Sequence, residues 1–204
     1  MEGLSTKRIE DVLSNQHFYD IYVEEVVDST NTFMKQRAEE GAKEGTVLIA
    51  LEQTAGRGRL GRSFLSPKGS GIYMSILFKP NKSADKSLIL TSAAALSVCK
   101  AIREIAGLDA NIKWVNDILL DEKKVCGILA EGKIASEAKM EYVVLGIGIN
   151  IKTPEGGFTD EIKDIATSLE NSTTKDLAVK LVAKILDNLY FYYEDMDLNE
   201  EYIQ

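Results

Sequence analysis

The segment GRGRLGRS, residues 56–63, holds the side chains best suited to chemistry, because three arginines and three glycines fall within eight positions. Arginine stays protonated at neutral pH and presents a planar fork of N–H groups to carboxylate or phosphate oxygens. Glycine lets backbone amides come close to a ligand, since it carries no side chain. The segment therefore predicts a binding site for one or more anionic groups.

The same segment matches two phosphate-binding templates, the G-x-G-x-x-G of dinucleotide binders and the G-x-x-x-x-G-K-[ST] of P-loops, with Arg62 at the lysine position. Both templates need a helix that begins at their last residues, because the helix N-terminus holds the phosphate. The following residues, FLSPKGSG, contain Pro67 and two glycines and predict a continued loop instead. Two alternatives stay open: a flexible surface loop with solvated arginines, and a mobile loop that closes over an anionic ligand, which we favour.

Charge along the chain supports a local anion site in an otherwise acidic protein. The net charge is -8 and the pI is about 4.9, which argue against a general nucleic-acid binder. No Asp or Glu occurs between Gln53 and Ala84. The cationic residues of that stretch are Arg57, Arg59, Arg62, Lys68, Lys79 and Lys82. We therefore expect no nucleic-acid partner and a positive patch confined to this region.

The counts of cysteine and histidine exclude several kinds of site. The two cysteines, Cys99 and Cys126, lack a C-x-x-C spacing, so we predict two buried apolar side chains and neither a disulfide framework nor a zinc site. His17 is the only histidine, and we expect it at the surface. It leaves at most one member for a Ser–His triad or a multi-histidine metal site. Catalysis would then depend on Lys, Arg, Asp and backbone amides.

Length and hydropathy bound the organisation of the chain. No apolar run approaches the roughly 18 residues that cross a bilayer, and the first residues, MEGLSTKRIED, lack a signal-peptide pattern. A chain of 204 residues with 45% hydrophobic content suits one domain with its own core. We therefore predict a single cytoplasmic domain, residues 1–204, without membrane contact.

Hydrophobic periodicity and turn residues predict an α+β fold. Strands are expected at residues 19–27, 46–52, 72–78, 112–115, 118–120, 124–134 and 139–151, and helices at 32–40, 88–106 and 175–195. Gly41 and Gly107 supply stop signals for the first two helices. Consecutive strands follow one another too closely for uniform parallel crossovers. We therefore expect a mixed, largely antiparallel sheet flanked by helices, with the helices on one side.

Five short segments, in this order, carry a resemblance to a known family. They are DSTN at 28–31, Gln53 with the loop at 56–64, KWVND at 113–117, KVCGILAE at 124–131 and GIGIN at 146–150. Each is weak alone, but their order over about 120 residues resembles the biotin protein ligases. The resemblance implies a catalytic domain like those of class II synthetases and lipoate ligases. It also implies an ATP-dependent ligase that forms biotinyl-5'-AMP and transfers biotin to a lysine of a biotin carboxyl carrier protein.

The resemblance also implies roles for particular residues. Biotin would contact Ser29, Thr30, Asn31, Gln53, Gly56, Arg57, Gly58, Arg59, Lys124, Gly127 and Gly146. ATP would contact Arg59, Arg62, Phe64, Lys113, Asn116, Ile128 and Asn150. The catalytic residues would be Lys124, Arg57, Arg59 and Asp117, the last steering or deprotonating the acceptor lysine. Mg²⁺ is expected to neutralise the departing pyrophosphate, although no acidic pair marks its ligands.

Plain structural roles stay open beside these assignments. Ser29 or Thr30 could cap the following helix, and Gly146 and Gly148 could mark only a twist or bulge, although they would also give a ligand close access to the strand. Trp114 lies in an apolar strand, so we expect it in the core. Two other functions also remain: a ligase of the same fold for lipoate or another small acid, and a biotin-binding sensor without turnover.

The sequence departs from the family pattern at several points. Val115 stands where the family usually has Pro, and Phe64 where it usually has Trp. The residues before Asp28 are too few for the DNA-binding domain of repressor-type members, and we expect no small β-barrel after the last helix. We therefore expect a catalytic domain without transcriptional control, and leave a homodimer open.

Overall fold

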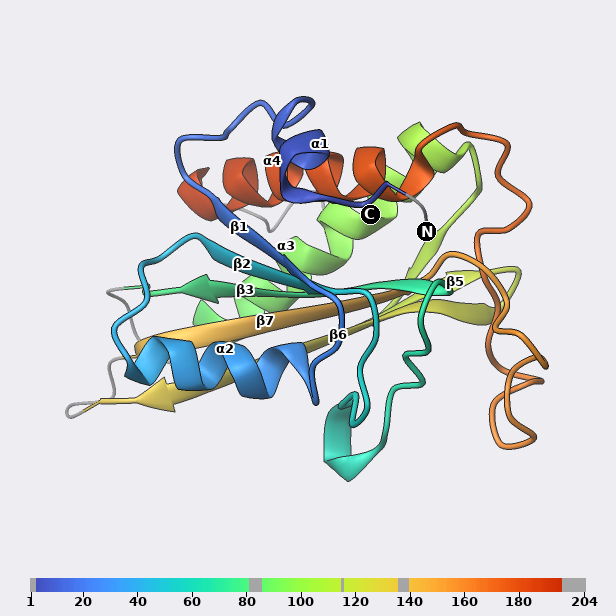
Figure 1. Ribbon diagram of the computed structural model, residues 1–204, viewed down its shortest axis with the longest axis horizontal. Coiled ribbons are helices and arrows are strands. Elements are labelled where there is room, and N and C mark those ends of the chain that lie inside the picture. Colours follow the sequence, from blue (N-terminus) through green and yellow to red (C-terminus); the bar gives the residue numbers. More distant parts are fainter. Residues whose placement is uncertain (1–2, 81–85, 115, 136–139, 196–204) are drawn as a thin grey trace.

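A seven-stranded mixed sheet forms the centre of the computed structural model, which describes residues 3–80, 86–114, 116–135 and 140–195 (Figure 1). The strand order is β1-β2-β3-β7-β6-β5-β4. The strands are β1 (Asp20–Glu24), β2 (Thr46–Ala50), β3 (Gly71–Phe78), β4 (Asn111–Lys113), β5 (Asp117–Leu120), β6 (Lys123–Ile134) and β7 (Met140–Asn150). β1 and β2 are parallel, and all other neighbouring pairs are antiparallel. The predicted mixed, largely antiparallel sheet is therefore confirmed.

Four α-helices of the described residues flank the sheet. They are α1 (Thr6–Glu10), α2 (Thr30–Glu39), α3 (Lys86–Ala101) and α4 (Leu177–Asp195). α3 continues into a π-helical turn, η2 (Ile102–Ala106), which ends where Gly107 takes a left-handed conformation at φ 69°. Glycine favours that conformation because it has no Cβ. The predicted stop at Gly107 is confirmed, and the three predicted helices are present with shifted ends.

The helices cover both faces of the sheet, so the expectation of helices on one side is wrong. α1, α3 and α4 pack on one face over the larger core, while α2 lies on the other face (Figure 1). Successive residues of β3 face opposite sides, so Ile76 joins the larger core and Leu77 joins a smaller cluster under α2. All of β3 is buried for this reason. The start of α2 and strands β3, β6 and β7 contribute to the site described below.

Trp114 lies outside the core, contrary to expectation. β4 is an edge strand that ends at Lys113, and Trp114 occupies the turn after it with 76% of its surface exposed. Apolar neighbours in the sequence do not bury a side chain at the edge of a sheet, where no further strand covers it. Val115 lies outside the described residues, so its predicted effect on this turn stays a prediction.

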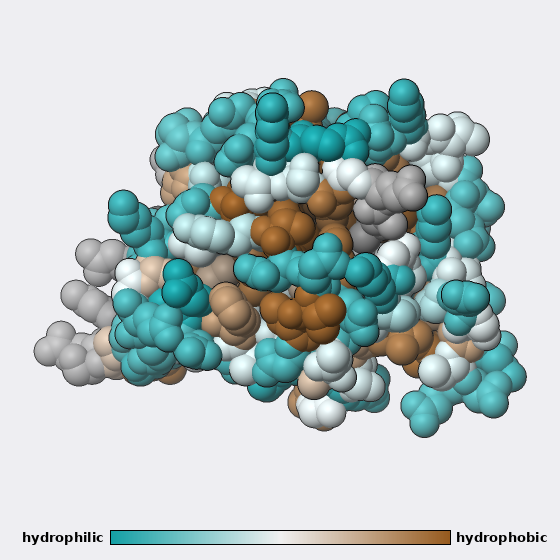
Figure 2. Space-filling view, viewed as in Figure 1, coloured by the Kyte–Doolittle hydropathy of each residue, from teal (hydrophilic) through white to brown (hydrophobic). Residues whose placement is uncertain are grey.

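The predictions for the two cysteines and for the histidine agree with the structure. Cys99 and Cys126 are buried and free, and His17 is exposed. No helix within the described ranges is long and apolar enough to span a bilayer. Figure 2 shows hydrophilic side chains over the helices and apolar side chains gathered near the centre of this face.

Candidate functional site

Residues 56–64, here called the arginine loop, form a small hairpin after β2. The Gly58 N–H donates to the Arg62 carbonyl at 2.7 Å, and the Phe64 N–H donates to the Gly56 carbonyl at 2.9 Å. The hairpin turns at Leu60 and Gly61, whose φ angles are 55° and 74°. The chain then runs without a further helix to β3, through residues that are all described. The helix that both phosphate templates require is therefore missing, and their rejection is confirmed.

A cavity of about 40 Å³ lies between the arginine loop, the start of α2, and strands β3, β6 and β7. Its lining comprises Ser29, Thr30, Asn31, Gln53, Arg57, Gly58, Arg59, Phe64, Tyr73, Met74, Asn116, Lys124, Gly127, Ile128, Leu129, Gly146, Ile147 and Gly148. Most of the residues assigned to biotin or ATP from the sequence thus meet at one place. Gly56, Arg62, Lys113, Asp117 and Asn150 are the assigned residues outside this lining.

Glycines make the floor of the cavity flat. Gly127 of β6 pairs with Gly148 of β7, and Gly148 pairs in turn with Tyr73 of β3. The ring of Phe64 lies over this row, since a Cβ on Gly148 would come within 2.6 Å of a ring carbon. A Cβ on Gly146 would collide with Oδ1 of Asn31. The atoms that approach Gly146 and Gly148 belong to the protein's own side chains, so the predicted close access for a ligand stays a prediction.

Ser29, Thr30 and Gln53 form a polar wall of the cavity. Ser29 is the N-cap of α2, and its side chain accepts from the Thr32 N–H at 3.5 Å. Gln53 Oε1 accepts from the Thr30 N–H at 2.8 Å and from the Thr30 hydroxyl at 3.1 Å. Gln53 Nε2 donates to Ser66 Oγ at 2.8 Å. Helix capping at DSTN is therefore confirmed, and it coexists with a position on the cavity wall.

The Glu131 carboxylate accepts hydrogen bonds from three side chains beside the cavity. It accepts from Asn31 Nδ2 at 2.9 Å, Lys35 Nζ at 3.0 Å and Arg57 Nη2 at 3.0 Å. Burial pushes the pKa of Glu131 upward, but the hydrogen bonds from Asn31 and Lys35 and the charges of Lys35 and Arg57 outweigh it, so the pKa is lowered overall. Asn31 is fixed from its other side, because its Oδ1 accepts from the buried Ser75 hydroxyl at 2.6 Å.

The motif KVCGILAE contains Glu131, but the sequence analysis assigns it no role. Strand periodicity could have indicated a place for Glu131 in the site, because it shares one face of β6 with Gly127 and Leu129. Tyr73, Met74, Leu129 and Ile147 also line the cavity and were also missed. Tyr73 packs edge-on to Phe64 and donates from its hydroxyl to the Pro67 carbonyl at 3.0 Å. Burial raises the pKa of the Tyr73 hydroxyl to about 12.

A chain of polar contacts joins the arginine loop to β6. Arg59 Nη1 donates to Asn116 Oδ1 at 2.7 Å, and Asn116 Nδ2 donates to Asp117 Oδ1 at 3.1 Å. The same Asp117 oxygen lies 2.7 Å from Lys124 Nζ. Asp117 thus stands behind the cavity and holds Lys124, which lines it. Two of the predicted catalytic cations are therefore connected through an amide and a carboxylate.

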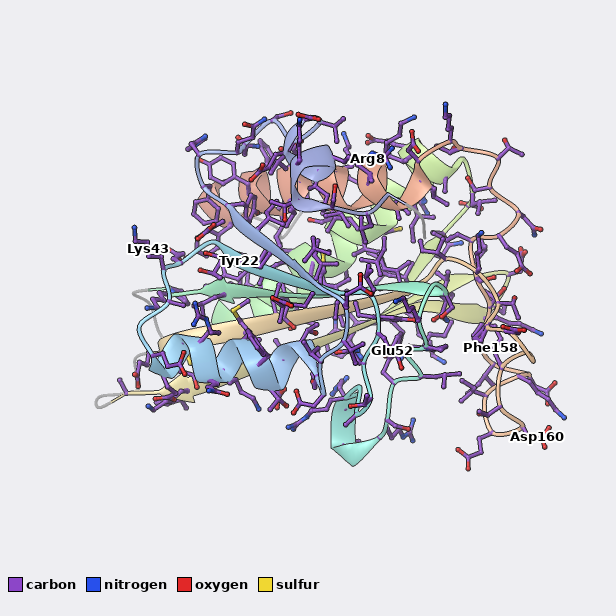
Figure 3. The ribbon with its side chains drawn as sticks, viewed as in Figure 1. Arg8, Tyr22, Lys43, Glu52, Phe158 and Asp160 are labelled. Carbon is purple, nitrogen blue, oxygen red and sulfur yellow. The ribbon has the colours of Figure 1, made fainter. Side chains whose placement is uncertain are left out.

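Residues 165–169, in the segment between β7 and α4, support the same end of β6. The Lys124 N–H donates to the Ile165 carbonyl at 2.7 Å, and the Thr167 N–H donates to the Lys124 carbonyl at 2.9 Å. Asn150 Nδ2 donates to the Thr167 carbonyl at 3.0 Å. Asn150 therefore faces this segment, whose part in the site the sequence analysis missed. Figure 3 labels Phe158 and Asp160 on the outer part of the same connection.

Arg62 and Lys113 are exposed and lie outside the cavity lining. Gly56 is buried beneath the loop, where a Cβ would collide with the Phe64 carbonyl oxygen. Among the described parts of the chain, no three His, Cys, Asp or Glu side chains come close enough together to hold a metal ion.

Comparison with known proteins identifies the family. The model of the biotin/lipoate A/B protein ligase family matches residues 23–150, a span that includes all five motifs. The chain belongs to this family. It is 43% identical over 148 residues to the bifunctional ligase/repressor BirA of Bacillus subtilis. The matched residues make up 72% of this chain and 45% of that protein. The chain thus spans about half the length of the curated relatives it matches.

Solved structures agree with this assignment. The biotin protein ligase from Aquifex aeolicus in complex with biotin and ATP matches with a TM-score of 0.69 and 36% identity, over 87% of this chain and 73% of that one. The biotin protein ligase from Leishmania major in complex with biotinyl-5-AMP matches with a TM-score of 0.64 and 28% identity, over 84% of this chain and 75% of that one. The resemblance to biotin protein ligases is therefore confirmed.

Proposed function

We propose that this chain is the catalytic part of an ATP-dependent biotin protein ligase. It would form biotinyl-5'-AMP from biotin and ATP, and then transfer biotin to a lysine of a biotin carboxyl carrier protein. The observation that carries this proposal is the meeting of Arg57, Arg59 and Lys124 at one cavity that Ser29 and Gln53 also line. The relatives described above, solved with biotin, ATP or the adenylate, support it.

The cations suit the first half-reaction. A carboxylate oxygen of biotin attacks the α-phosphorus of ATP. A new P–O bond forms between them, and the bond from the α-phosphorus to the departing pyrophosphate breaks. Two anions must approach each other in this step, so fixed positive groups lower its barrier. Arg57 and Arg59 would hold the carboxylate and the nascent anhydride, while Lys124 would bridge the carboxylate and the α-phosphate. Ser29 and Gln53 would hydrogen-bond the ureido ring.

Both substrates need more room than the cavity provides. Sites for small molecules usually enclose about 300–1,000 Å³, whereas this one measures about 40 Å³. Arg57, Gly58, Arg59 and Phe64 of the arginine loop line the cavity, so we propose that this loop moves when the substrates bind. A loop that closes again over the bound substrates would exclude water from the reactive anhydride.

The adenylate and the metal are assigned less directly. Asn116 and Ile128 line the cavity and would face the nucleotide, with Arg62, Lys113 and Asn150 further out. Mg²⁺ usually keeps several waters and binds through substrate phosphates, which needs no cage of protein carboxylates. We therefore propose that Mg²⁺ enters with ATP.

The second half-reaction needs a neutral lysine amine on the carrier protein. The amine attacks the acyl carbon of the anhydride, and AMP leaves. Asp117 remains our candidate for steering or deprotonating that amine, although its carboxylate already contacts Lys124 and Asn116. A cytoplasmic location and a homodimer stay predictions.

Biotin-dependent exchange between pyrophosphate and ATP tests the first half-reaction. The chain should catalyse exchange with biotin and Mg²⁺ and yield biotinyl-5'-AMP on acid quenching. Exchange with lipoate and none with biotin would favour the lipoate ligase instead. Tight biotin binding in titration calorimetry without any exchange would favour a sensor that lacks turnover.

A further inference from the structure

Glu131 forms an ion pair with Arg57, the arginine that the proposed reaction assigns to the substrate carboxylate. Arg57 Nη2 lies 3.0 Å from Glu131 Oε1, across 74 positions of sequence. The Glu131 side chain is only 21% exposed, whereas the Arg57 side chain is 47% exposed. Glu131 lies on strand β6 of the central sheet, whereas Arg57 lies on the arginine loop.

We propose that Glu131 is a positioning residue for Arg57. In the ligand-free protein its carboxylate holds the guanidinium, and the carboxylate of the bound substrate takes its place. This inference rests on the proposed function for the identity of the competing ligand. The contact between Glu131 and Arg57 needs no ligand and can be tested alone.

The exchange leaves no charge unpaired. When Arg57 moves to the substrate, Glu131 keeps Lys35 Nζ at 3.0 Å and Asn31 Nδ2 at 2.9 Å. A partly buried carboxylate that lost its last donor would carry a large desolvation cost. Arg57 trades one carboxylate for another, so the net change in its interactions is small. Arg57 can therefore leave Glu131 without leaving an unpaired carboxylate in the substrate-bound state.

Glu131 also anchors one side of the arginine loop. The other side is held by Arg59, whose Nη1 donates to Asn116 Oδ1 at 2.7 Å. Between these contacts the loop lies over a cavity of about 40 Å³. Loss of the Glu131 contact should therefore raise the fraction of molecules whose loop stands open.

Trypsin offers a direct measure of loop opening, because it cleaves after arginine and the loop contains Arg57, Arg59 and Arg62. Glu131→Gln leaves the cleavage sites unchanged. An amide has one acceptor oxygen, so it cannot accept from Asn31 on one side and from Lys35 and Arg57 on the other. Without ligand, cleavage in the loop should be about threefold to fivefold faster than in the wild-type protein, as expected for loss of a half-exposed ion pair.

Glu39→Gln is the matched control. Glu39 lies on α2, and its carboxylate accepts from Lys133 Nζ at 2.8 Å and from the Tyr142 hydroxyl at 2.9 Å. This variant loses the same charge near the same strands but leaves Arg57 and Glu131 together, so its loop should be cut at the wild-type rate. Glu131→Asp keeps the charge on a shorter side chain. It should give an intermediate rate, and serves if the amide variant does not fold.

The second arm adds saturating biotin, ATP and Mg²⁺. If Arg57 then holds the substrate, wild type and Glu131→Gln should be cut at the same reduced rate. Equal cleavage of the two ligand-free proteins, or a difference that persists unchanged under ligand protection, would overturn the proposal. If the ligands protect neither protein, the proposed function is in doubt, and the ligand-free comparison still decides whether Glu131 holds the loop.

Discussion

Lys124 Nζ lies 2.7 Å from Asp117 Oδ1, in an ion pair that joins the start of β6 to the start of β5. The backbone of Lys124 is held as well, because its N–H and carbonyl both bond to residues 165–167. The side chain is 35% exposed and lines the cavity. A cation fixed from both ends needs little reorganisation to meet developing negative charge, which is the condition for electrostatic catalysis.

Lys124→Ala should therefore slow biotin-dependent pyrophosphate exchange by about 100-fold, the typical cost of removing one fixed donor from a developing charge. The fold should persist, because the backbone contacts of this position do not use the side chain. Lys123→Ala is the control, since Lys123 is the exposed neighbour on the same strand. Exchange kinetics that match those of the control would remove Lys124 from the catalytic residues.

Arg59→Ala should release the adenylate early. The variant loses a cation over the anhydride and the contact to Asn116 that holds the loop down. Loss of a hydrogen bond to a charged group predicts release at least about tenfold faster. Free adenylate acylates exposed lysines, so biotin should appear on an unrelated protein in the same mixture. Arg37→Ala, at an exposed surface pair on α2, should not do this. Labelling by Arg59→Ala that remains confined to the carrier protein would contradict the role of the loop as a cover.

Gly148→Ala and Gly146→Ala should lower stability through different neighbours. A Cβ at 148 meets the Phe64 ring at 2.6 Å, whereas a Cβ at 146 meets the hydrogen-bonded amide of Asn31. Phe64→Ala should therefore restore at least half of the melting temperature lost in Gly148→Ala and none of that lost in Gly146→Ala. Interacting residues are non-additive in this way. Equal restoration in both double variants, measured by thermal unfolding, would mean that Phe64 does not lie on Gly148.

Stability should depend on pH through Glu131. Its pKa in the folded protein lies below the ordinary value of 4.5, so the unfolded chain takes up the proton first as the pH falls. The stabilisation is thus fully present above about pH 4.5 and is lost as the pH drops through the lower folded-state pKa. Urea unfolding should give a free-energy difference between wild type and Glu131→Gln of at most about 1 kcal/mol at pH 7. That difference should narrow below pH 4.5, and one that stays constant down to pH 3 would contradict the assignment.

Local patterns predicted much of the fold because they report local physics. The cap at Ser29 follows from DSTN, and the end of the helix at Gly107 follows from the freedom of glycine to adopt positive φ. The rejection of both phosphate templates succeeded for the same reason, since Pro67 and its flanking glycines act on their own backbone. Trp114 shows where this reasoning fails, because its exposure depends on β4 being an edge strand.

The sequence by itself determined the seven strands, the helices α2, α3 and α4, the family, and the list of side chains that could hold an anion. Only the tertiary structure decided which of them face one another. Arg57 and Glu131 are 74 positions apart, and Lys124 is held by residues 165–167, beyond the end of β7. Such pairings follow from strand order and register, and from which face of each strand is covered. They are set by the burial of the whole core rather than by any short segment.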